Sequence, residues 1–265
     1  MRTSFLSLVI IGFVLGVSTI SGALEDKALV LFFSFTSNQG DTVKDLSGNG
    51  NDGTLNGGAK WMPGKYGGGV YLDGKDDFIE IPNVIAEKGT IEFWFKPDWD
   101  GSDKEDYRIF DASLGGIYFF ISKGADHADI VPQFFGFYFE DASDADWQDI
   151  EFDPAGIISA GKWFHVAATW EFGGGSAFLY IDGKEIATSP NKLGAKPELN
   201  PNPRFGLEVI KYVPSRNGAQ GVIDEIAIYN RALKEKEIEK DLTFTSPVEL
   251  TGKLATTWSE IKKTE

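Results

Sequence analysis

Cysteine is absent from the 265-residue sequence. Its absence excludes disulfide bridges and a lipid-modified cysteine at an export site, so core packing and any bound metal must stabilise the protein. Only two histidines occur, His127 and His165, and they are not spaced as a zinc site. The pattern Gly-x-Ser-x-Gly is also missing, which removes the usual nucleophile elbow of a hydrolase.

Basic residues are few relative to acidic ones. There are 25 Lys and Arg against 40 Asp and Glu, which gives a formal net charge of −15 at pH 7. Binding to nucleic acid or to anionic lipid headgroups requires clustered Lys and Arg. We therefore expect neither a nucleic acid partner nor a membrane-surface role. The excess of carboxylates instead suits hard cations such as calcium.

Long apolar runs are confined to the N-terminus. Arg2 precedes an apolar run over 5–17, and the small residues Ser21, Gly22 and Ala23 follow. This pattern is typical of a cleaved export signal, whereas a retained membrane helix needs about 20 apolar residues and is the weaker alternative. We expect a signal peptide over 1–23, one domain over 24–242 and a tail over 243–265. The protein is then secreted, periplasmic or at the cell surface, with no membrane insertion after cleavage.

Helical periodicity is almost absent from the rest of the chain. Short apolar or alternating runs between Gly, Asn and Asp clusters predict strands at 28–35, 69–72, 78–81, 90–97, 108–111, 117–121, 134–139, 163–171, 177–181, 204–210 and 221–229. The pairs Asp73-Gly74 and Asp182-Gly183 predict two-residue hairpins. The alternation over 90–97 predicts one buried face and a partly wet reverse face. We expect an all-β, two-sheet antiparallel jelly-roll sandwich with one short surface helix at 231–242.

Six blocks of sequence resemble, in order, the laminin-G-like domains of the concanavalin A-like jelly-roll class. They are DLSGNGNDGTL at 45–55, GKYGG at 64–68 leading to YLDG at 71–74, TIEFWF at 90–95, GKWFHVAATW at 161–170, LYIDGK at 179–184 and IDEIAIYNRAL at 223–233. The resemblance covers about residues 28–242. It implies a sandwich of two curved sheets, usually a module that recognises carbohydrate or protein without catalysis and often carries calcium.

The segment 45–56 has the oxygen spacing of a calcium loop. Oxygen-bearing side chains stand at positions 1, 3 and 5, glycine at position 6, and a backbone carbonyl is available at position 7. An EF-hand is excluded because Asn56 replaces its final Glu. In a jelly roll the first and last strands lie close, so a late carboxylate can complete the site, and the resemblance points the same way. The expected calcium ligands are Asp45, Ser47, Asn49, Asn51 and Asp224. The alternative is a turn whose Asp45 and Asn51 side chains bond the backbone and whose glycines adopt positive φ.

Three acids at alternate positions, Asp149, Glu151 and Asp153, are the strongest sign of an enzyme. Alternation places them on one strand face about 7 Å apart at Cα, which side-chain rotation can reduce to the roughly 5–5.5 Å of a retaining glycosidase. They are similar to the Glu-x-Asp-x-Glu pattern of jelly-roll glucanases, but Asp replaces each outer Glu and Glu replaces the central Asp. The alternative is a solvated loop and strand edge within the acidic run 140–153.

Sugar recognition requires exposed aromatic faces beside carboxylates or amides. The aromatic residues that stand among charged residues, and so are expected to bind a ligand, are Trp94, Trp99, Tyr107, Tyr118 and Trp147. We expect Trp61, Trp163 and Trp170 in the core, and His165 packed within its strand. The loop with Asp126, His127 and Asp129 is either a loose metal site or a flexible loop.

Taken together, the sequence predicts a secreted binding module with a structural calcium, a glycan ligand and no catalysis. An alternative is a protein-interaction or adhesion module of the cell envelope whose contact segment is the tail 243–265. A second alternative is a jelly-roll glycoside hydrolase that uses the acids of 149–153.

Overall fold

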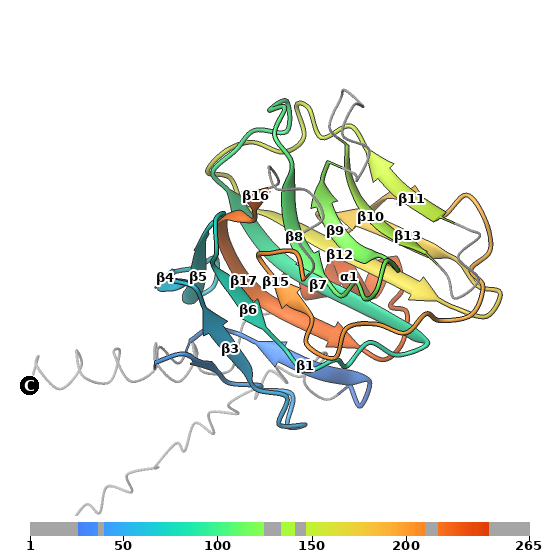
Figure 1. The fold of residues 1–265 in the computed structure, drawn as a ribbon, viewed down its shortest axis with the longest axis horizontal. Coiled ribbons are helices and arrows are strands. Elements are labelled where there is room, and N and C mark those ends of the chain that lie inside the picture. Colours follow the sequence, from blue (N-terminus) through green and yellow to red (C-terminus); the bar gives the residue numbers. More distant parts are fainter. Residues whose placement is uncertain (1–25, 37–39, 125–133, 141–146, 210–216, 244–265) are drawn as a thin grey trace, which may run out of the picture.

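The computed structural model describes residues 26–36, 40–124, 134–140, 147–209 and 217–243 (Figure 1). The expected signal peptide, all of the expected tail but Thr243, and the loop with Asp126, His127 and Asp129 lie outside these residues. The described elements are β1 (Leu29–Phe33), β2 (Thr42–Val43), β3 (Gly53–Asn56), β4 (Lys60–Pro63), β5 (Gly68–Asp73), β6 (Phe78–Glu80), β7 (Lys88–Pro97), β8 (Tyr107–Asp111), β9 (Phe119–Lys123), β10 (Phe135–Glu140), β11 (Trp147–Phe152), β12 (Phe164–Glu171), β13 (Ala177–Ile181), β14 (Lys184–Thr188), β15 (Arg204–Phe205), β16 (Asn217–Gly218), β17 (Gln220–Tyr229) and α1 (Glu235–Asp241).

Two sheets form the sandwich. Sheet A has the strand order β14-β13-β12-β7-β17-β5-β4, with β1 also paired to β17. Sheet B has the order β11-β10-β9-β8-β15-β6-β3-β2, with β16 also paired to β8. Every pairing is antiparallel except the short one between β16 and β8. The expected all-β sandwich with one short helix is confirmed.

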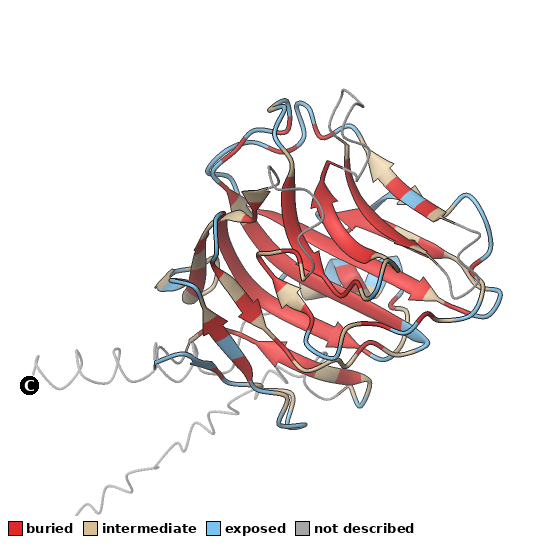
Figure 2. Ribbon diagram, viewed as in Figure 1, coloured by how far each residue is buried: buried red, intermediate tan, exposed pale blue. Residues whose placement is uncertain are grey.

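The core lies between the two sheets, where alternate residues of each strand point inward. Figure 2 shows the central strands buried along most of their length and the exposed residues gathered in the loops and edge strands. Phenylalanine dominates this core: Phe93, Phe95, Phe119 and Phe137 have no exposed surface. Burial of each such side chain contributes about 1.5–3 kcal/mol. Trp170 is fully buried as expected, but Trp61 and Trp163 are only partly buried.

The reverse face of sheet A is also covered. A second apolar cluster, which includes Phe32, Tyr229, Leu233 and Ile238, packs α1 against this face. The expectation of a partly wet reverse face on β7 is therefore wrong. Glu92 and Trp94, which alternate with the inward phenylalanines, are only 3% and 8% exposed. Their cover comes from segments distant in the sequence, which local alternation cannot reveal.

The two predicted hairpins have different outcomes. Asp182-Gly183 joins β13 to β14, which pair antiparallel from Ile181 opposite Lys184, and both turn residues have positive φ. That hairpin is confirmed. Asp73-Gly74 instead begins the connection from β5 in sheet A to β6 in sheet B, so the prediction of a hairpin there is wrong. In the described part of the chain, no helix has the length and apolar character needed to span a membrane.

Candidate functional site

The predicted calcium loop 45–51 is held by its own hydrogen bonds. One carboxylate oxygen of Asp45 accepts from the backbone N–H groups of Phe32 (3.0 Å) and Ser47 (2.9 Å). The other accepts from the Ser47 hydroxyl and from the Asn51 N–H, both at 2.9 Å. Gly48 and Gly50 have φ of 87° and 77°. These are the features of the alternative interpretation, a turn whose side chains bond the backbone.

The amides of this loop bond the free edge of β1. Asn49 Nδ2 donates to the carbonyl of Leu29 (3.0 Å), and Asn51 Nδ2 donates to that of Val30 (2.8 Å). An uncovered edge strand invites pairing with another chain, and side chains that occupy its polar groups prevent this. The observed role of the loop is therefore to cover the edge of sheet A at β1. Calcium binding at this loop stays a prediction.

Asp224, the fifth expected calcium ligand, lies in β17 and has its own backbone partners. Its Oδ2 accepts from the N–H groups of Lys65 (2.8 Å) and Tyr66 (2.9 Å), and its Oδ1 accepts from Glu225 N–H (2.8 Å). The carboxylate is fully buried. It thus fixes the turn at 64–67, where the Lys65 ammonium lies 4.2 Å from the centre of the Trp94 ring.

Three of the five expected ligand-binding aromatics are buried, which differs from the exposed ring face expected of each. Trp94 packs edge-to-face against His165 on the reverse face of sheet A, with ring centroids 5.3 Å apart. Trp99 and Tyr107 stack on one another with centroids 4.8 Å apart, and they are 3% and 4% exposed. The Tyr107 hydroxyl donates to Asp103 at 3.0 Å, and burial together with that carboxylate raises the pKa of Tyr107.

Tyr118 and Trp147, the other two expected aromatics, come together on sheet B. Both are partly exposed, and their rings meet edge-to-face with centroids 5.3 Å apart. Each also packs against Phe120, at 6.1 Å and 6.2 Å between centroids. Because Phe120 alternates with the inward residues Phe119 and Ile121 of β9, this aromatic group lies on the outer face of the sheet.

Two of the three expected catalytic acids lie on the same sheet face as this aromatic pair, and one of them contacts it. Asp149 and Glu151 alternate with Ile150 of the core, so both lie on the outer face of β11. Trp147 Nε1 donates to Asp149, and Tyr138 donates from its hydroxyl to Glu151 Oε2 at 2.7 Å. Burial of Tyr138, and secondarily the Glu151 and Asp149 charges, raises the pKa of its phenol, which keeps the donor protonated.

Asp153, the third acid, lies just beyond the end of β11. Its Oδ1 accepts from the Ala155 N–H at 2.9 Å, which closes a turn. The structure thus brings together the residues Tyr118, Trp147, Asp149 and Glu151, which we call the outer-face site. It places Trp94, Trp99 and Tyr107 elsewhere in the molecule.

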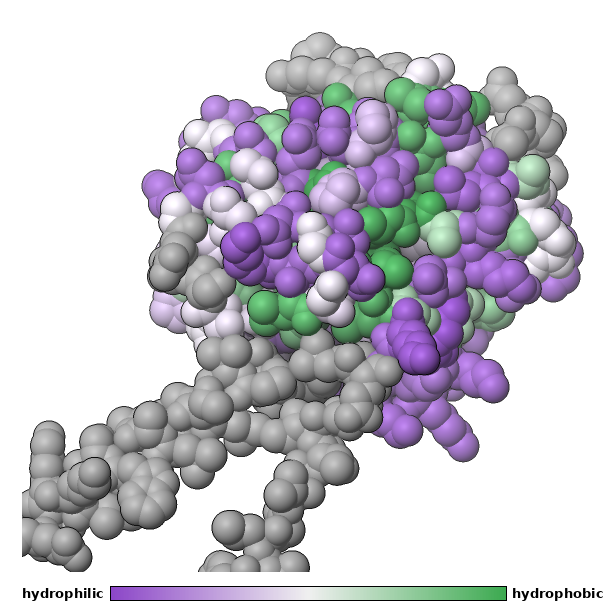
Figure 3. All heavy atoms as spheres, turned by 90° about the horizontal axis from the view of Figure 1, so that it is seen from below, coloured by the Kyte–Doolittle hydropathy of each residue, from purple (hydrophilic) through white to green (hydrophobic). Residues whose placement is uncertain are grey.

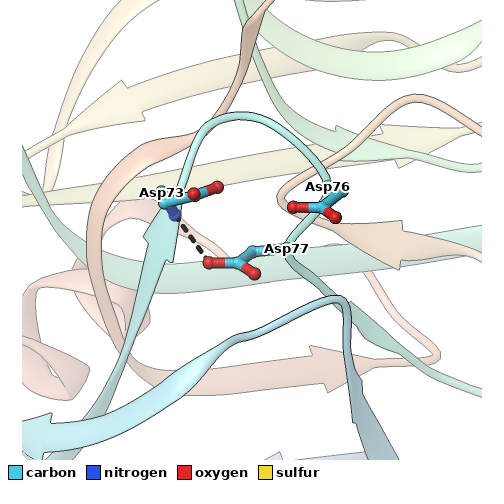
Figure 4. A group of neighbouring side chains, drawn as sticks. All are labelled: Asp73, Asp76 and Asp77. Carbon is cyan, nitrogen blue, oxygen red and sulfur yellow. Dashed lines mark hydrogen bonds between the residues drawn. The ribbon is translucent and has the colours of Figure 1, made fainter.

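An acidic cluster that the sequence interpretation missed lies between β5 and β6. Asp73, Asp76 and Asp77 can bring one carboxylate oxygen each within 4.8 Å of the others. Figure 4 shows the Asp77 carboxylate accepting from the backbone N–H of Asp73, at 2.9 Å, with Asp76 on the other limb of the loop. Burial raises the pKa of Asp77, and the neighbouring Asp73 and Asp76 charges add to the rise. The sequence signal was the run Asp-Gly-Lys-Asp-Asp at 73–77.

Hydrophobic side chains are mostly withdrawn from the surface. The large apolar residues that the described structure exposes are Leu46, Ile157 and Ile186. Figure 3 nevertheless shows a strip of hydrophobic residues crossing one face between hydrophilic ones. The described surface is thus largely polar, and on it the outer-face site combines partly exposed rings with carboxylates.

A two-sheet antiparallel sandwich of this strand order defines the jelly-roll class of fold. Residues 73–239, more than half of the chain, match the model of the concanavalin A-like lectin/glucanases superfamily. The chain belongs to this family, as the resemblance in the sequence implied. No curated protein sequence matches the chain.

Several solved structures share the fold. One is domain 4 of an extracellular GH43 arabinanase from Geobacillus stearothermophilus in complex with arabinotriose, with 21% identity, a TM-score of 0.62, and coverage of 80% of this chain and 97% of that domain. Another is the receptor binding domain of the botulinum neurotoxin C/D mosaic serotype, with 18% identity and a TM-score of 0.60. A third is the binding domain of botulinum neurotoxin DC in complex with SialylT, with 19% identity and a TM-score of 0.60. Each neurotoxin match covers 80% of this chain but spans only 50% of the neurotoxin chain.

These comparisons correct one expectation. The sequence predicted a protein without catalysis, on the strength of a fold class that is usually a binding module. The family model covers glucanases as well as lectins, and one similar structure is a domain of an arabinanase. The fold therefore does not support the exclusion of an enzyme, and by itself it does not show catalysis.

Proposed function

We propose that the protein binds carbohydrate at the outer-face site of sheet B. The observation that carries this proposal is the partly exposed Tyr118 and Trp147 pair with Asp149 beside it and Glu151 further along the same sheet face. Aromatic faces pack against the C–H side of a sugar ring, and carboxylates accept hydrogen bonds from its hydroxyls. We further propose that the protein is exported, because its first residues have the pattern of a signal peptide.

Oligosaccharides of two kinds are the first probes. A similar domain was solved with arabinotriose and another with SialylT. Arabino-oligosaccharides and sialylated oligosaccharides, placed on an array of many glycans, therefore test the proposal directly. The array is run with calcium and with chelator, because calcium, expected from the sequence, remains part of the proposal.

Substitutions at the aromatic pair test the location of the site. We expect Trp147→Ala and Tyr118→Ala each to weaken binding about tenfold, since one aromatic contact contributes about 1 kcal/mol or more. The matched control is Trp163→Ala, which removes a partly buried tryptophan next to sheet A, where Lys96 covers its ring at 5.3 Å. Unchanged affinity in Trp147→Ala would place binding elsewhere.

Glycoside hydrolysis is a second candidate, favoured by the two acids on the same face. Asp149 and Glu151 lie on the same outer face as the aromatic pair, and the family includes glucanases. Release of reducing sugar from β-glucan that Glu151→Gln abolishes would establish this activity. Binding without any such release leaves carbohydrate recognition as the function.

Recognition of a protein receptor is the other alternative, since one similar structure is a receptor binding domain. Loss of binding to every glycan, together with capture of a purified cell-envelope protein that Trp147→Ala abolishes, would favour it over carbohydrate. In that case the outer-face site keeps its role but takes a different ligand.

A further inference from the structure

A small cavity lies beneath the C-terminal end of α1, on the face of sheet A that the helix covers. It has a volume of about 10 Å³, room for about one water molecule, and β1, β7, β12 and β17 supply its other walls. The polar residues that line it are Glu92, His165, Glu225, Tyr229 and Asp241. The carbohydrate-binding site proposed above includes none of these groups.

Two carboxyl groups meet in this cavity. Glu92, in the middle of β7, and Asp241, the last residue of α1, both line this cavity, and their carboxyl groups interact there. Tyr229 donates from its hydroxyl to Asp241 Oδ2 at 3.0 Å. Glu92 is only 3% exposed. Two carboxylates that share a buried site are costly to ionise together, so we expect the pair to hold one proton.

The proton belongs on Glu92. Burial and the neighbouring Asp241 raise the pKa of Glu92 well above its ordinary value. Asp241, which accepts hydrogen bonds from both Glu92 and Tyr229, is the better carboxylate, although burial also raises its pKa. A neutral Glu92 is then placed to donate to an ionised Asp241, a bond that would tie α1 to the centre of sheet A.

Among the described residues, those that line the cavity provide no compensating cation. From β12, His165 Nε2 lies 3.8 Å from Glu92 Oε2, but burial lowers the pKa of His165 to about 3, so the ring is neutral. From β17, the cavity receives Glu225 and the phenol of Tyr229, and from β1 it receives only apolar side chains. None of the described residues that line the cavity is Lys or Arg.

The charged side chains Arg231 and Lys65, which flank the cavity, already have other interaction partners. Arg231, which precedes α1, binds Asp26 and Glu237. The Arg231 charge lowers the pKa of Asp241, whereas the Glu237 charge raises it. In the turn at 64–67, the Lys65 ammonium lies over the Trp94 ring, and the Tyr66 hydroxyl donates to the Leu242 carbonyl at 2.6 Å.

We propose that Glu92 and Asp241 form a proton-dependent clamp that holds the C-terminal end of α1 against sheet A and releases it as the pH rises. Loss of the Glu92 proton places two anions in one buried site, with no cation among the described residues that line it. Lifting the helix end lets water reach both groups. The same movement uncovers the apolar residues of the cavity wall, among them Leu29 and Phe32.

The pH range follows from the direction of the shift. The pKa of Glu92 is raised in the closed state and ordinary, about 4.3, once water reaches it. The clamp is therefore at full strength below that ordinary pKa and weakens as the pH rises through the closed-state pKa. Between the two values, opening releases one proton, so the opening constant grows about tenfold per pH unit.

Hydrogen exchange of the full chain tests the clamp. Protection factors of peptides that span α1, corrected for the intrinsic pH dependence of exchange, are measured from pH 4 to pH 8. Peptides of β12 serve as the internal reference. We expect the protection of α1 to fall about tenfold per pH unit at first and then to level off, with β12 unchanged.

Three variants separate the clamp from general destabilisation. Glu92→Gln keeps the hydrogen-bond donor but cannot ionise, so the protection of its α1 should be independent of pH. Glu239→Gln makes the same change at an exposed position of the same helix and should follow the wild type. If Glu92→Gln does not fold, Asp241→Asn removes the second charge. Burial still raises the pKa of Glu92 in that variant, but less than in the wild type, so the fall in protection should level off at a lower pH. A pH-independent wild type, or a variant whose profile matches that of the wild type, would overturn the proposal.

Discussion

The carboxylate of Asp45 accepts a hydrogen bond from the backbone N–H of Phe32, at 3.0 Å. This bond joins a surface loop to β1, whose only strand partner in the described structure is β17. The Asp45 carboxylate accepts three more hydrogen bonds, two of them from backbone N–H groups of the loop. The loop thus serves as a substitute for a neighbouring strand at this edge.

Removal of Asp45 tests whether hydrogen bonds or a cation stabilise the loop. From the observed bonds we expect Asp45→Ala to lower the free energy of unfolding by about 2 kcal/mol, equally in calcium and in chelator. The measurement is urea denaturation in both buffers, with Asp41→Ala, at an exposed position, as the control. A loss that appears only in calcium would instead support the metal site predicted from the sequence.

Much of the fold could be predicted because strand alternation is local. The alternation over 90–97 identifies β7 and its inward phenylalanines, and Asp182-Gly183 identifies a hairpin. What covers the reverse face could not be predicted, because the cover of Trp94 comes from Lys65 and that of Glu92 from Asp241. Contacts of this kind depend on the assembled sheet.

The candidate site was predictable only in part, for a similar reason. The spacing of Asp45, Ser47 and Asn51 identifies a set of oxygen ligands, but not whether a cation or an N–H group meets them. An aromatic residue that stands among charged residues in the sequence can either lie on the surface and bind a ligand or pack in the interior. Trp147 lies on an outer face, whereas Trp99 is stacked beneath the surface on Tyr107.

Gly89 is predicted to tolerate no side chain. A Cβ at this position would lie 2.2 Å from the indole of Trp170, which is fully buried and donates to the Ala86 carbonyl at 3.0 Å. We expect Gly89→Ala to lower the free energy of unfolding by about 2–3 kcal/mol through overpacking. Thermal and urea unfolding measure the loss.

The control is a double-mutant cycle with Trp170→Phe, which removes the ring atoms that clash with the new Cβ. The two substitutions should couple favourably by about 1 kcal/mol or more. Additive losses would show that Gly89 is required for another reason.

Asp76 is predicted to destabilise the protein at neutral pH. Its charge adds to the burial that raises the pKa of Asp77, so ionised Asp77 is less favourable in the folded state than in the unfolded state. That contribution is absent in acid and appears as the pH rises through the pKa of Asp77. Asp76→Asn should therefore increase the free energy of unfolding by a few tenths of a kcal/mol at pH 7.

The gain from Asp76→Asn should vanish at pH 3 and diminish in high salt, which screens the exposed charge. Glu87→Gln, at another exposed position, should give no comparable gain. Reduced stability in Asp76→Asn at pH 7 would indicate that the cluster binds a cation under the conditions used.

His165 is predicted to destabilise the fold in acid. Burial lowers its pKa to about 3, so the ring stays neutral in the folded protein while the unfolded chain takes up a proton below about pH 6.5. The stability associated with the neutral ring is fully present above pH 6.5 and is lost as the pH falls toward 3. The slope is about 1.4 kcal/mol per pH unit for one proton.

Replacement of His165 by Gln should remove this acid loss, because the amide does not titrate. Urea denaturation from pH 4 to pH 8 compares the two proteins, with Glu239→Gln as a variant that retains His165. Since release of the Glu92 proton weakens the fold in the opposite direction, the His165→Gln protein should retain only a decline toward alkaline pH. Parallel stability curves for wild type and His165→Gln below pH 6 would show that the imidazole is protonated in the folded protein, paired with an ionised Glu92, and that the proton assignment in the cavity must be reversed.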